Sequence, residues 1–142
     1  SFKVKYEIVP GITSGIGSAT YAGIPLTHRK YASSAVFVTG HEDPEKNEEI
    51  VKWKKLAKSV DTIVIMMGLS RIGIISKQLI EGGMKKSTPV AVIQNGTTPK
   101  QKMIVGTLTN IATKIKKEKM SPPANIIIGE VVKLHKTIGW KK

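Results

Sequence analysis

The stretch that decides the fold is residues 61–67, Asp-Thr-Ile-Val-Ile-Met-Met, an almost wholly apolar run of strand length. Such a run predicts a strand that is buried on both faces, which usually means a sheet lying between two layers of helices. Residues 69–80 follow with apolar side chains at helical spacing, and the pair Gly82-Gly83 stops the pattern. A buried strand followed at once by an amphipathic helix is typical of an α/β fold.

Short apolar runs predict four more strands, at residues 34–39, 88–94, 103–108 and 125–132. Helices are expected at residues 48–57 and from an N-cap at Thr109 through Ile115. The alternating pattern of residues 2–9 could form a further strand. Residues 1–142 are therefore predicted to form a single α/β domain, with a mixed, roughly five-stranded sheet flanked by helices.

The composition restricts the class of protein. Lys and Arg total 23 against 10 Asp and Glu, giving a net charge of +13, and only Arg29 and Arg71 are arginines. No apolar run is long enough to cross a bilayer, and no secretory signal is visible. The absence of cysteine excludes disulfides, thiolate metal sites and cysteine nucleophiles. These features predict a cytoplasmic globular domain.

The glycine-rich residues 11–17 (GITSGIG) follow the possible first strand. They lack the third glycine of the GxGxxG fingerprint, and the chain has no GxxxxGK motif, so neither a dinucleotide site nor a P-loop is predicted. What remains is a junction at which Thr13 and Ser14 offer hydroxyls and backbone N–H groups to a ligand. The simpler alternative is that one of these two residues only caps the helix.

Two predicted strands end in short motifs, residues 66–68 (MMG) and 95–97 (NGT). Ligands of open α/β sheets tend to lie at the carboxyl ends of strands. With the junction at Thr13 and Ser14, these ends would surround one cleft if their strands are parallel neighbours. Core packing is the alternative role for the methionines.

The remaining polar candidates lie on the loop of residues 25–29 (PLTHR), where Thr27, His28 and Arg29 either bind a ligand or form a solvated turn. The three histidines show no metal-ligand spacing, so no metal site is predicted. The positive charge raises nucleic-acid binding as an alternative function. An aromatic content of 5%, the scarcity of arginine and the lack of a recognisable binding motif disfavour it.

The order of the motifs closely resembles that of the uroporphyrinogen-III C-methyltransferases, within the tetrapyrrole methylase family. The most specific parts of the resemblance are residues 9–14 (VPGITS) and 21–29 (YAGIPLTHR). They distinguish this family from other tetrapyrrole methylases, diphthine synthases and ribosomal RNA methylases. Further matches follow in the same order, so that the resemblance covers nearly the whole chain: residues 39–41 (TGH), 67–68 (MG), 95–101 (NGTTPKQ), 106–108 (GTL) and 129–132 (GEVV).

The resemblance implies the C-terminal domain of a two-domain enzyme whose N-terminal domain carries a GPG loop that is absent from this sequence. The family transfers methyl groups from S-adenosylmethionine, leaving S-adenosylhomocysteine, to two ring carbons of uroporphyrinogen III. The product, formed through precorrin-1, is precorrin-2, a precursor of sirohaem and cobalamin. Residues 1–142 alone should hold half of each binding site and be inactive. Another tetrapyrrole (precorrin) methylase is the alternative.

The resemblance implies three partners: uroporphyrinogen III, the N-terminal domain and a second copy in a homodimer. Neither a membrane nor a nucleic acid is expected as a partner. Matched position by position, the resemblance assigns the cofactor to Thr13, Ser14, Met67, Gly96 and Ala124. Substrate carboxylates are expected at Thr27, His28 and Arg29, because a guanidinium binds a carboxylate through two hydrogen bonds. The chain departs from the family where Met66 replaces the usual tyrosine and Ser14 the usual alanine, and no general base is identified.

Overall fold

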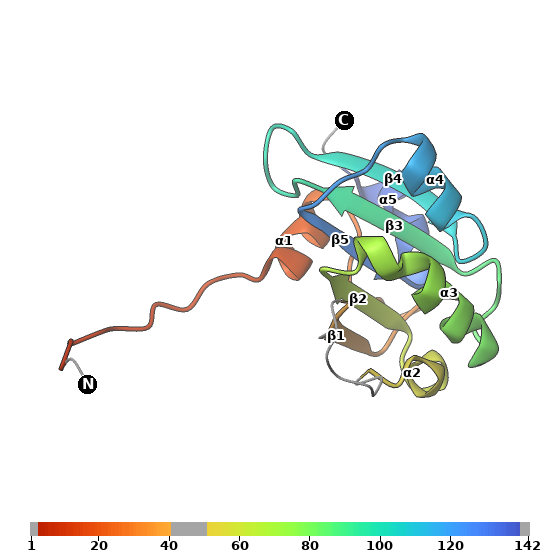
Figure 1. The fold of residues 1–142 in the computed structure, drawn as a ribbon, viewed down its shortest axis with the longest axis horizontal. Coiled ribbons are helices and arrows are strands. Elements are labelled where there is room, and N and C mark those ends of the chain that lie inside the picture. The colour runs from red at the N-terminus through yellow and green to blue at the C-terminus, as the bar shows by residue number, and fades with distance from the viewer. Residues whose placement is uncertain (1–2, 41–50, 140–142) are drawn as a thin grey trace.

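The computed structural model describes residues 3–40 and 51–139, and within them five strands form one mixed sheet in the order β1-β2-β5-β3-β4. Figure 1 shows the sheet at the centre of the molecule. The strands are β1 (Ala35–Thr39), β2 (Thr62–Met66), β3 (Pro89–Gln94), β4 (Lys102–Thr107) and β5 (Ala124–Ile128). The predicted α/β class and five-stranded mixed sheet are therefore confirmed.

Strand direction determines which chain segments meet where the strands begin or end. We call each of these two sides of the sheet, which run across the ends of the strands, an edge. β1 and β2 are parallel, whereas β5 runs antiparallel to both of its neighbours, β2 and β3, and β4 runs antiparallel to β3. The carboxyl ends of β1, β2 and β3 consequently lie at one edge of the sheet, together with the amino end of β5. β2 and β3 run in the same direction but are separated by β5, so the condition of parallel neighbours is not met, and their ends nevertheless lie at the same edge.

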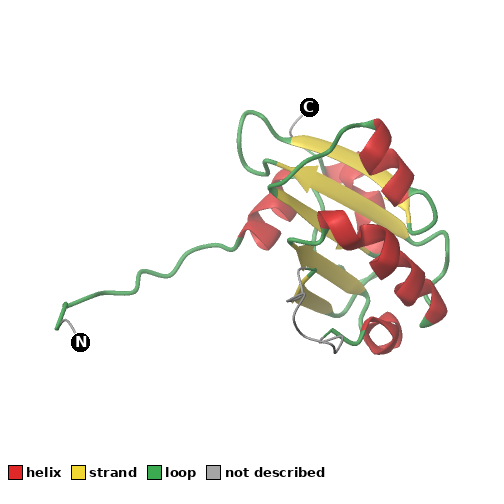
Figure 2. Cartoon of the chain, in the orientation of Figure 1, coloured by secondary structure: helices red, strands yellow, loops and turns green. Residues whose placement is uncertain are grey.

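Helices cover both faces of the sheet, as Figure 2 shows. One face carries α2 (Trp53–Ser59), α3 (Ile72–Glu81), which follows the short 3₁₀ helix η1 (Leu69–Arg71), and α4 (Ile111–Lys117). The other face carries α1 (Ser14–Tyr21) and the 3₁₀ helix η2 (Glu130–Leu134), which leads into α5 (His135–Ile138). None of the helices within the described residues is long and apolar enough to span a membrane.

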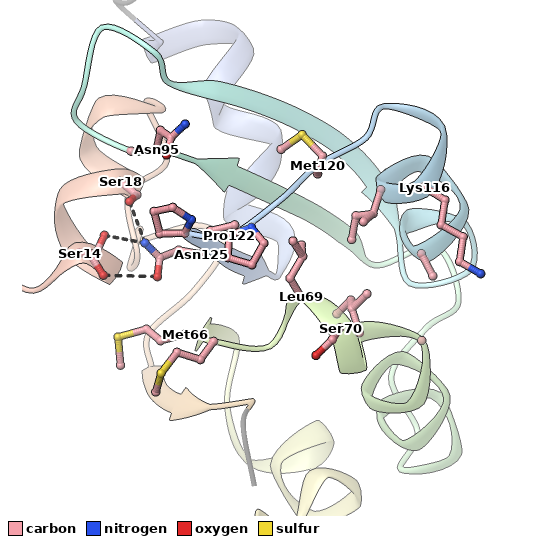
Figure 3. Close-up of a pocket in the computed structure, with 18 of the residues that line it drawn as sticks. Ser14, Ser18, Met66, Leu69, Ser70, Asn95, Lys116, Met120, Pro122 and Asn125 are labelled. Atoms are coloured by element: carbon pink, nitrogen blue, oxygen red, sulfur yellow. Dashed lines mark hydrogen bonds between the residues drawn. The ribbon is translucent and has the colours of Figure 1, made fainter.

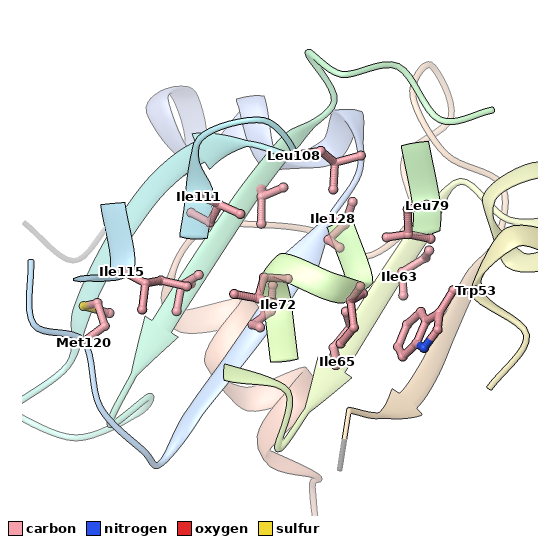
Figure 4. Packing of buried hydrophobic residues seen from close by; sticks show 14 residues of the cluster. Trp53, Ile63, Ile65, Ile72, Leu79, Leu108, Ile111, Ile115, Met120 and Ile128 are labelled. Atoms are coloured by element: carbon pink, nitrogen blue, oxygen red, sulfur yellow. The ribbon is translucent and has the colours of Figure 1, made fainter. Parts of the chain in front are cut away.

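Alternate residues of the central strands point to opposite faces and form two separate apolar clusters. The larger cluster, drawn in Figure 4, packs Ile63, Ile65 and Ile128 against α2, α3 and α4. The smaller one packs Ile93 and Ile127 against α1 and η2. Because both faces are covered, β2, β3 and β5 have no polar alternation, and this is why they appear in the sequence as continuous apolar runs.

The structure differs from the sequence predictions at the first segment of the chain, at the end of the last strand and at the start of α4. Residues 3–13 form no strand and extend away from the body as an arm, visible in Figure 1. The last strand ends at Ile128 rather than 132, because Gly129 takes a φ of 143° and turns the chain into η2. Thr109 does not cap α4: Asn110 precedes this helix, and the Thr109 hydroxyl donates to the Lys86 carbonyl at 3.0 Å.

The predicted helix at residues 48–57 is found in part, as α2, which begins at Trp53. Residues 48–50 lie outside the described part of the chain, as does residue 41 of the TGH motif.

Candidate functional site

A cavity of about 1100 Å³ opens at the edge of the sheet where β2 and β3 end and β5 begins. Its walls come from α1, the connection between β2 and α3, the turn between β3 and β4, α4 and the segment that enters β5, as Figure 3 shows. We call it the edge cavity and define it by these lining residues: Ser14, Ser18, Met66, Met67, Leu69, Ser70, Ile72, Gly73, Ile74, Asn95, Gly96, Thr98, Ala112, Ile115, Lys116, Met120, Pro122, Pro123, Ala124 and Asn125.

The two strand ends at the edge cavity have strained backbones. Met67 follows β2 with a φ of 55°, and Asn95 follows β3 with a φ of 50°. Residues other than glycine rarely adopt these left-handed conformations, and such residues cluster at ligand sites. Met67 is 65% exposed, so packing into the core does not account for its conformation.

Helix α1 begins beside these ends. Thr13 stands at its N-cap position with φ −63° and ψ 147°, but its side chain makes no capping hydrogen bond. Its hydroxyl instead points at the Met66 sulfur, 3.7 Å away, while its carbonyl accepts from the Ile16 and Gly17 amides, each at 3.0 Å. The simple capping alternative therefore does not describe Thr13.

A polar group buried under α1 connects this helix to β5. The Asn125 amide nitrogen donates to the Ser14 carbonyl at 3.1 Å and to the Ser18 hydroxyl oxygen at 2.9 Å, and these bonds are drawn in Figure 3. The Ser14 hydroxyl is 3.5 Å from the Asn125 side-chain oxygen. The sequence reasoning missed both Asn125 and Ser18, although an asparagine directly before Ile126 is a visible anomaly in an apolar strand.

The structure brings together most of the residues expected to hold the cofactor. Ser14, Met67, Gly96 and Ala124 all line the edge cavity, although they come from four separate segments of the chain. Thr13 does not line it but touches Met66, which does. The lining also includes α4 residues, among them Ile115, that no motif indicated.

The three residues expected at the substrate lie elsewhere on this chain. Thr27, His28 and Arg29 do not line the edge cavity, and His28 closes a short turn by pairing with Ala32. The residues after this turn, Ser33 and Ser34, precede β1 and bind Asp61, which precedes β2. The turn is therefore joined to the amino ends of β1 and β2, at the opposite edge of the sheet from the edge cavity.

Asp61 is a structural carboxylate. One of its oxygens accepts from the backbone N–H and hydroxyl of Ser33, at 2.9 and 3.0 Å, and of Ser34, at 3.2 and 3.0 Å. These hydrogen bonds hold the pKa of Asp61 below its usual value, and the bond from the Ser33 backbone N–H lowers the pKa most. Within the described residues no group of three or more His, Asp or Glu side chains could hold a metal ion.

The fold is of the α/β class, and its cavity lies at the carboxyl ends of β2 and β3, the place where ligands of open α/β sheets tend to bind. Residues 2–112 match the family of tetrapyrrole (corrin/porphyrin) methylases. The chain belongs to this family, as the sequence resemblance implied.

Particular relatives agree with this assignment. The chain is 47% identical, over 140 residues, to an S-adenosyl-L-methionine-dependent uroporphyrinogen III methyltransferase of Methanosarcina barkeri, covering 99% of this chain and 55% of the relative. It resembles the structure of the Thermus thermophilus uroporphyrin-III C-methyltransferase complexed with S-adenosylhomocysteine, with a TM-score of 0.76, 32% identity and coverage of 93% and 54%. A cobalt precorrin-4 methyltransferase superposes with a TM-score of 0.80 at 27% identity, with coverage of 89% and 52%. The chain thus spans about half the length of these relatives.

Proposed function

We propose that this chain supplies part of the cofactor and substrate cleft of an S-adenosylmethionine-dependent uroporphyrinogen-III C-methyltransferase. The observation that carries the proposal is that Ser14, Met67, Gly96 and Ala124, matched to the family's cofactor positions one by one, line a single cavity. The Methanosarcina barkeri relative, 47% identical, is named for the same activity.

The edge cavity suits a cofactor that combines a nucleoside with an amino acid. Its volume of about 1100 Å³ is ample for such a molecule. The methionine side chains and Leu69 offer apolar walls for a base, while Ser14 and Asn95 contribute polar groups to the lining. When bound, S-adenosylmethionine supplies an activated methyl group, and its sulfonium is already a good leaving group.

The task of these residues is to bind and orient rather than to react. The electron-rich pyrrole carbon is itself the nucleophile, so the protein must hold it about 3–3.5 Å from the methyl carbon, in line, and exclude water. Met66 and Met67, at the end of β2, are the side chains that we assign to the wall facing the donor. Precorrin-2, formed through precorrin-1, is the product that we propose.

The proposal includes parts that lie outside these 142 residues. Since the chain spans about half the length of its relatives, we propose that it acts as the C-terminal domain and that an N-terminal domain with a GPG loop completes the cleft. A homodimer and a cytoplasmic location belong to the same proposal. Thr27, His28 and Arg29 would then meet substrate carboxylates only where another part of the assembly approaches the opposite edge of the sheet.

Calorimetric titration with S-adenosylhomocysteine tests the cofactor assignment in the full-length enzyme. Tight binding is expected, and Met67→Arg should abolish it, because a charged side chain would extend from the wall into the site. Ile138→Arg is the matched control, since Ile138 is 50% exposed and does not line the edge cavity. Unchanged affinity in Met67→Arg would remove Met67 from the site.

The 142-residue chain alone should bind the cofactor weakly or not at all and should not turn over substrate. Methylation by this chain alone would show that the divided-site proposal is wrong.

A precorrin methylase is the second candidate, favoured by the similarity to the cobalt precorrin-4 methyltransferase structure. The two functions differ in the acceptor, so an assay with uroporphyrinogen III and with an already methylated precorrin separates them. Methylation of only the second acceptor would replace the first proposal with this one.

A further inference from the structure

Asn125 is a buried polar residue in an otherwise apolar strand. It is 7% exposed, and the three isoleucines that follow it in β5 are completely buried. In the sheet it pairs with Met66 of β2 on one side and Ile93 of β3 on the other. It therefore stands between the two strand ends that form the edge cavity.

Helix α1 lies against the sheet through small residues. The buried residues of α1 are Gly15, Ser18 and Ala19, and no large apolar side chain of this helix is buried. A β-carbon on Gly15 would be only 3.0 Å from side-chain carbons of Phe37 and Val64, which shows how closely the helix backbone approaches the side chains of β1 and β2. Small residues permit this close approach but give little shape to fix how the helix is rotated or shifted along the sheet.

The hydrogen bonds of Asn125 fix the rotation and the position of α1 along the sheet. Ser14 and Ser18 are four residues apart and lie on one side of the helix. The single Asn125 amide donates to both, at 3.1 and 2.9 Å. Buried polar contacts of this kind are best attested as devices that select one packing arrangement among several. A shift or rotation of α1 would break both bonds and leave a buried amide without acceptors, which is costly.

We propose that Asn125 is a positioning residue: through Ser14 and Ser18 it fixes the first turn of α1 at the mouth of the edge cavity. The inference rests on the proposed function, because Ser14 and the neighbouring Thr13 belong to the proposed cofactor site. Asn125 acts here through α1 and has no part in the methyl transfer itself.

The first test measures the anchoring directly, by amide hydrogen exchange in the 142-residue chain. Asn125→Leu, similar in size but without donors, should speed exchange at residues 18–21 of α1 and leave α3 unaffected. Asn110→Ala is the matched control. It too removes a hydrogen bond between a side chain and the backbone, because the Asn110 side-chain oxygen accepts from the Thr107 amide at 2.8 Å, but this bond lies at the opposite edge of the sheet. Equal exchange in α1 of Asn125→Leu and of the wild type would overturn the proposal.

The second test measures the consequence for the cofactor, as the Kd for S-adenosylhomocysteine of the full-length enzyme well below its Tm. Asn125→Leu and Asn125→Asp should each raise the Kd about tenfold, because each removes the amide that donates to both Ser14 and Ser18. Ser18→Ala should also raise it, and the double variant should be less than additive, because both changes break the same link. A lower Tm with an unchanged Kd would show a merely structural role and overturn the proposal.

The two tests separate the two proposals. If the wild-type enzyme does not bind S-adenosylhomocysteine, the proposed function fails, and the exchange experiment still reports whether Asn125 anchors α1. If the wild type binds and the Asn125 and Ser18 variants bind equally well, the positioning role alone fails. Should Asn125→Leu not fold, Asn125→Asp and Ser18→Ala provide the same comparison.

Discussion

The backbone of Gly96 lies directly against the side chain of Ser18, so that a β-carbon at residue 96 would overlap the Ser18 hydroxyl and β-carbon. Ser18 cannot yield freely, because its hydroxyl accepts from Asn125 at 2.9 Å. The turn between β3 and β4 and the helix α1 therefore meet only because residue 96 has no side chain. This contact joins two walls of the edge cavity.

Gly96→Ala should destabilise the protein by about 1–3 kcal/mol, the usual cost of overpacking, because either α1 or the turn must move. Urea unfolding at neutral pH measures the change in free energy. Gly11→Ala is the control, since nothing lies within 4 Å of a β-carbon at that position. Equal stabilities of the two variants would show that the contact is relaxed in solution.

Substitutions of Met67 should affect the stability of the protein and its affinity for the cofactor differently. Met67→Gly and Met67→Ala both remove the side chain beyond the β-carbon, but only glycine, which lacks the β-carbon too, relieves the left-handed backbone with its φ of 55°. The glycine variant should therefore be the more stable of the two, by about 1 kcal/mol. In the full-length enzyme both should lose affinity for S-adenosylhomocysteine to a similar extent.

Thermal unfolding of the two Met67 variants, followed by titration, checks both parts. If the alanine variant is as stable as the glycine variant, the backbone at residue 67 is not strained. If both variants retain full affinity, the left-handed backbone at residue 67 is needed to form the turn and not to bind the cofactor.

Much of the fold could be predicted from residues 61–67 and the other apolar runs, because strands buried on both faces appear as continuous apolar stretches. The position of β5 could not. Its place between β2 and β3 depends on pairings such as Asn125 with both Met66 and Ile93, which no local pattern encodes. The end of β5 was indicated in the sequence by Gly129. The structure shows why glycine is needed there, because a β-carbon would lie 2.5 Å from the Asp61 carbonyl oxygen.

The candidate site was predictable where short motifs end strands, as at Met67 and Gly96. It was not predictable where contacts join residues that are remote in sequence, as between Ser18 and Asn125. Thr13 illustrates a third case. Its sequence context suggests a helix cap, but its hydroxyl turns to Met66, so a tertiary contact replaces the local one.

Gly23 should be essential for seating the C-terminal helix. Its φ is 67°, and a β-carbon would overlap the backbone of Gly139, just after α5. Gly83 is a close comparison, because its φ is also positive, at 105°, but its β-carbon would meet only the flexible end of Lys58 at 3.3 Å. Gly23→Ala should therefore cost about 1–3 kcal/mol more than Gly83→Ala, the added cost being that of overpacking.

Chemical denaturation of the two alanine variants gives the difference in free energy, and hydrogen exchange at residues 135–139 shows whether α5 is displaced. Equal losses would mean that backbone conformation alone matters and that α5 adapts to the new side chain.

Asp61 should make stability depend on pH in the acid range. Its pKa is lowered in the folded chain by hydrogen bonds from Ser33 and Ser34. An acid with a depressed folded pKa stabilises the protein above its unfolded pKa, near 3.9, and the stabilisation is lost as the pH falls through the lower folded value. Asp61→Asn should thus be less stable than the wild type at pH 7, and the difference should shrink below about pH 4.

Urea unfolding of both proteins between neutral and acid pH measures this convergence. Glu7→Gln, which makes the same change of charge in the extended arm, is the control for the general effect of net charge. The high positive charge of the chain grows as its carboxylates are protonated, so both variants and the wild type lose stability in acid for that reason alone. Only a convergence specific to Asp61→Asn shows that the four hydrogen bonds at one carboxylate oxygen hold the chain segments before β1 and β2 together. A constant difference at every pH would instead assign the loss to the shape of the asparagine side chain.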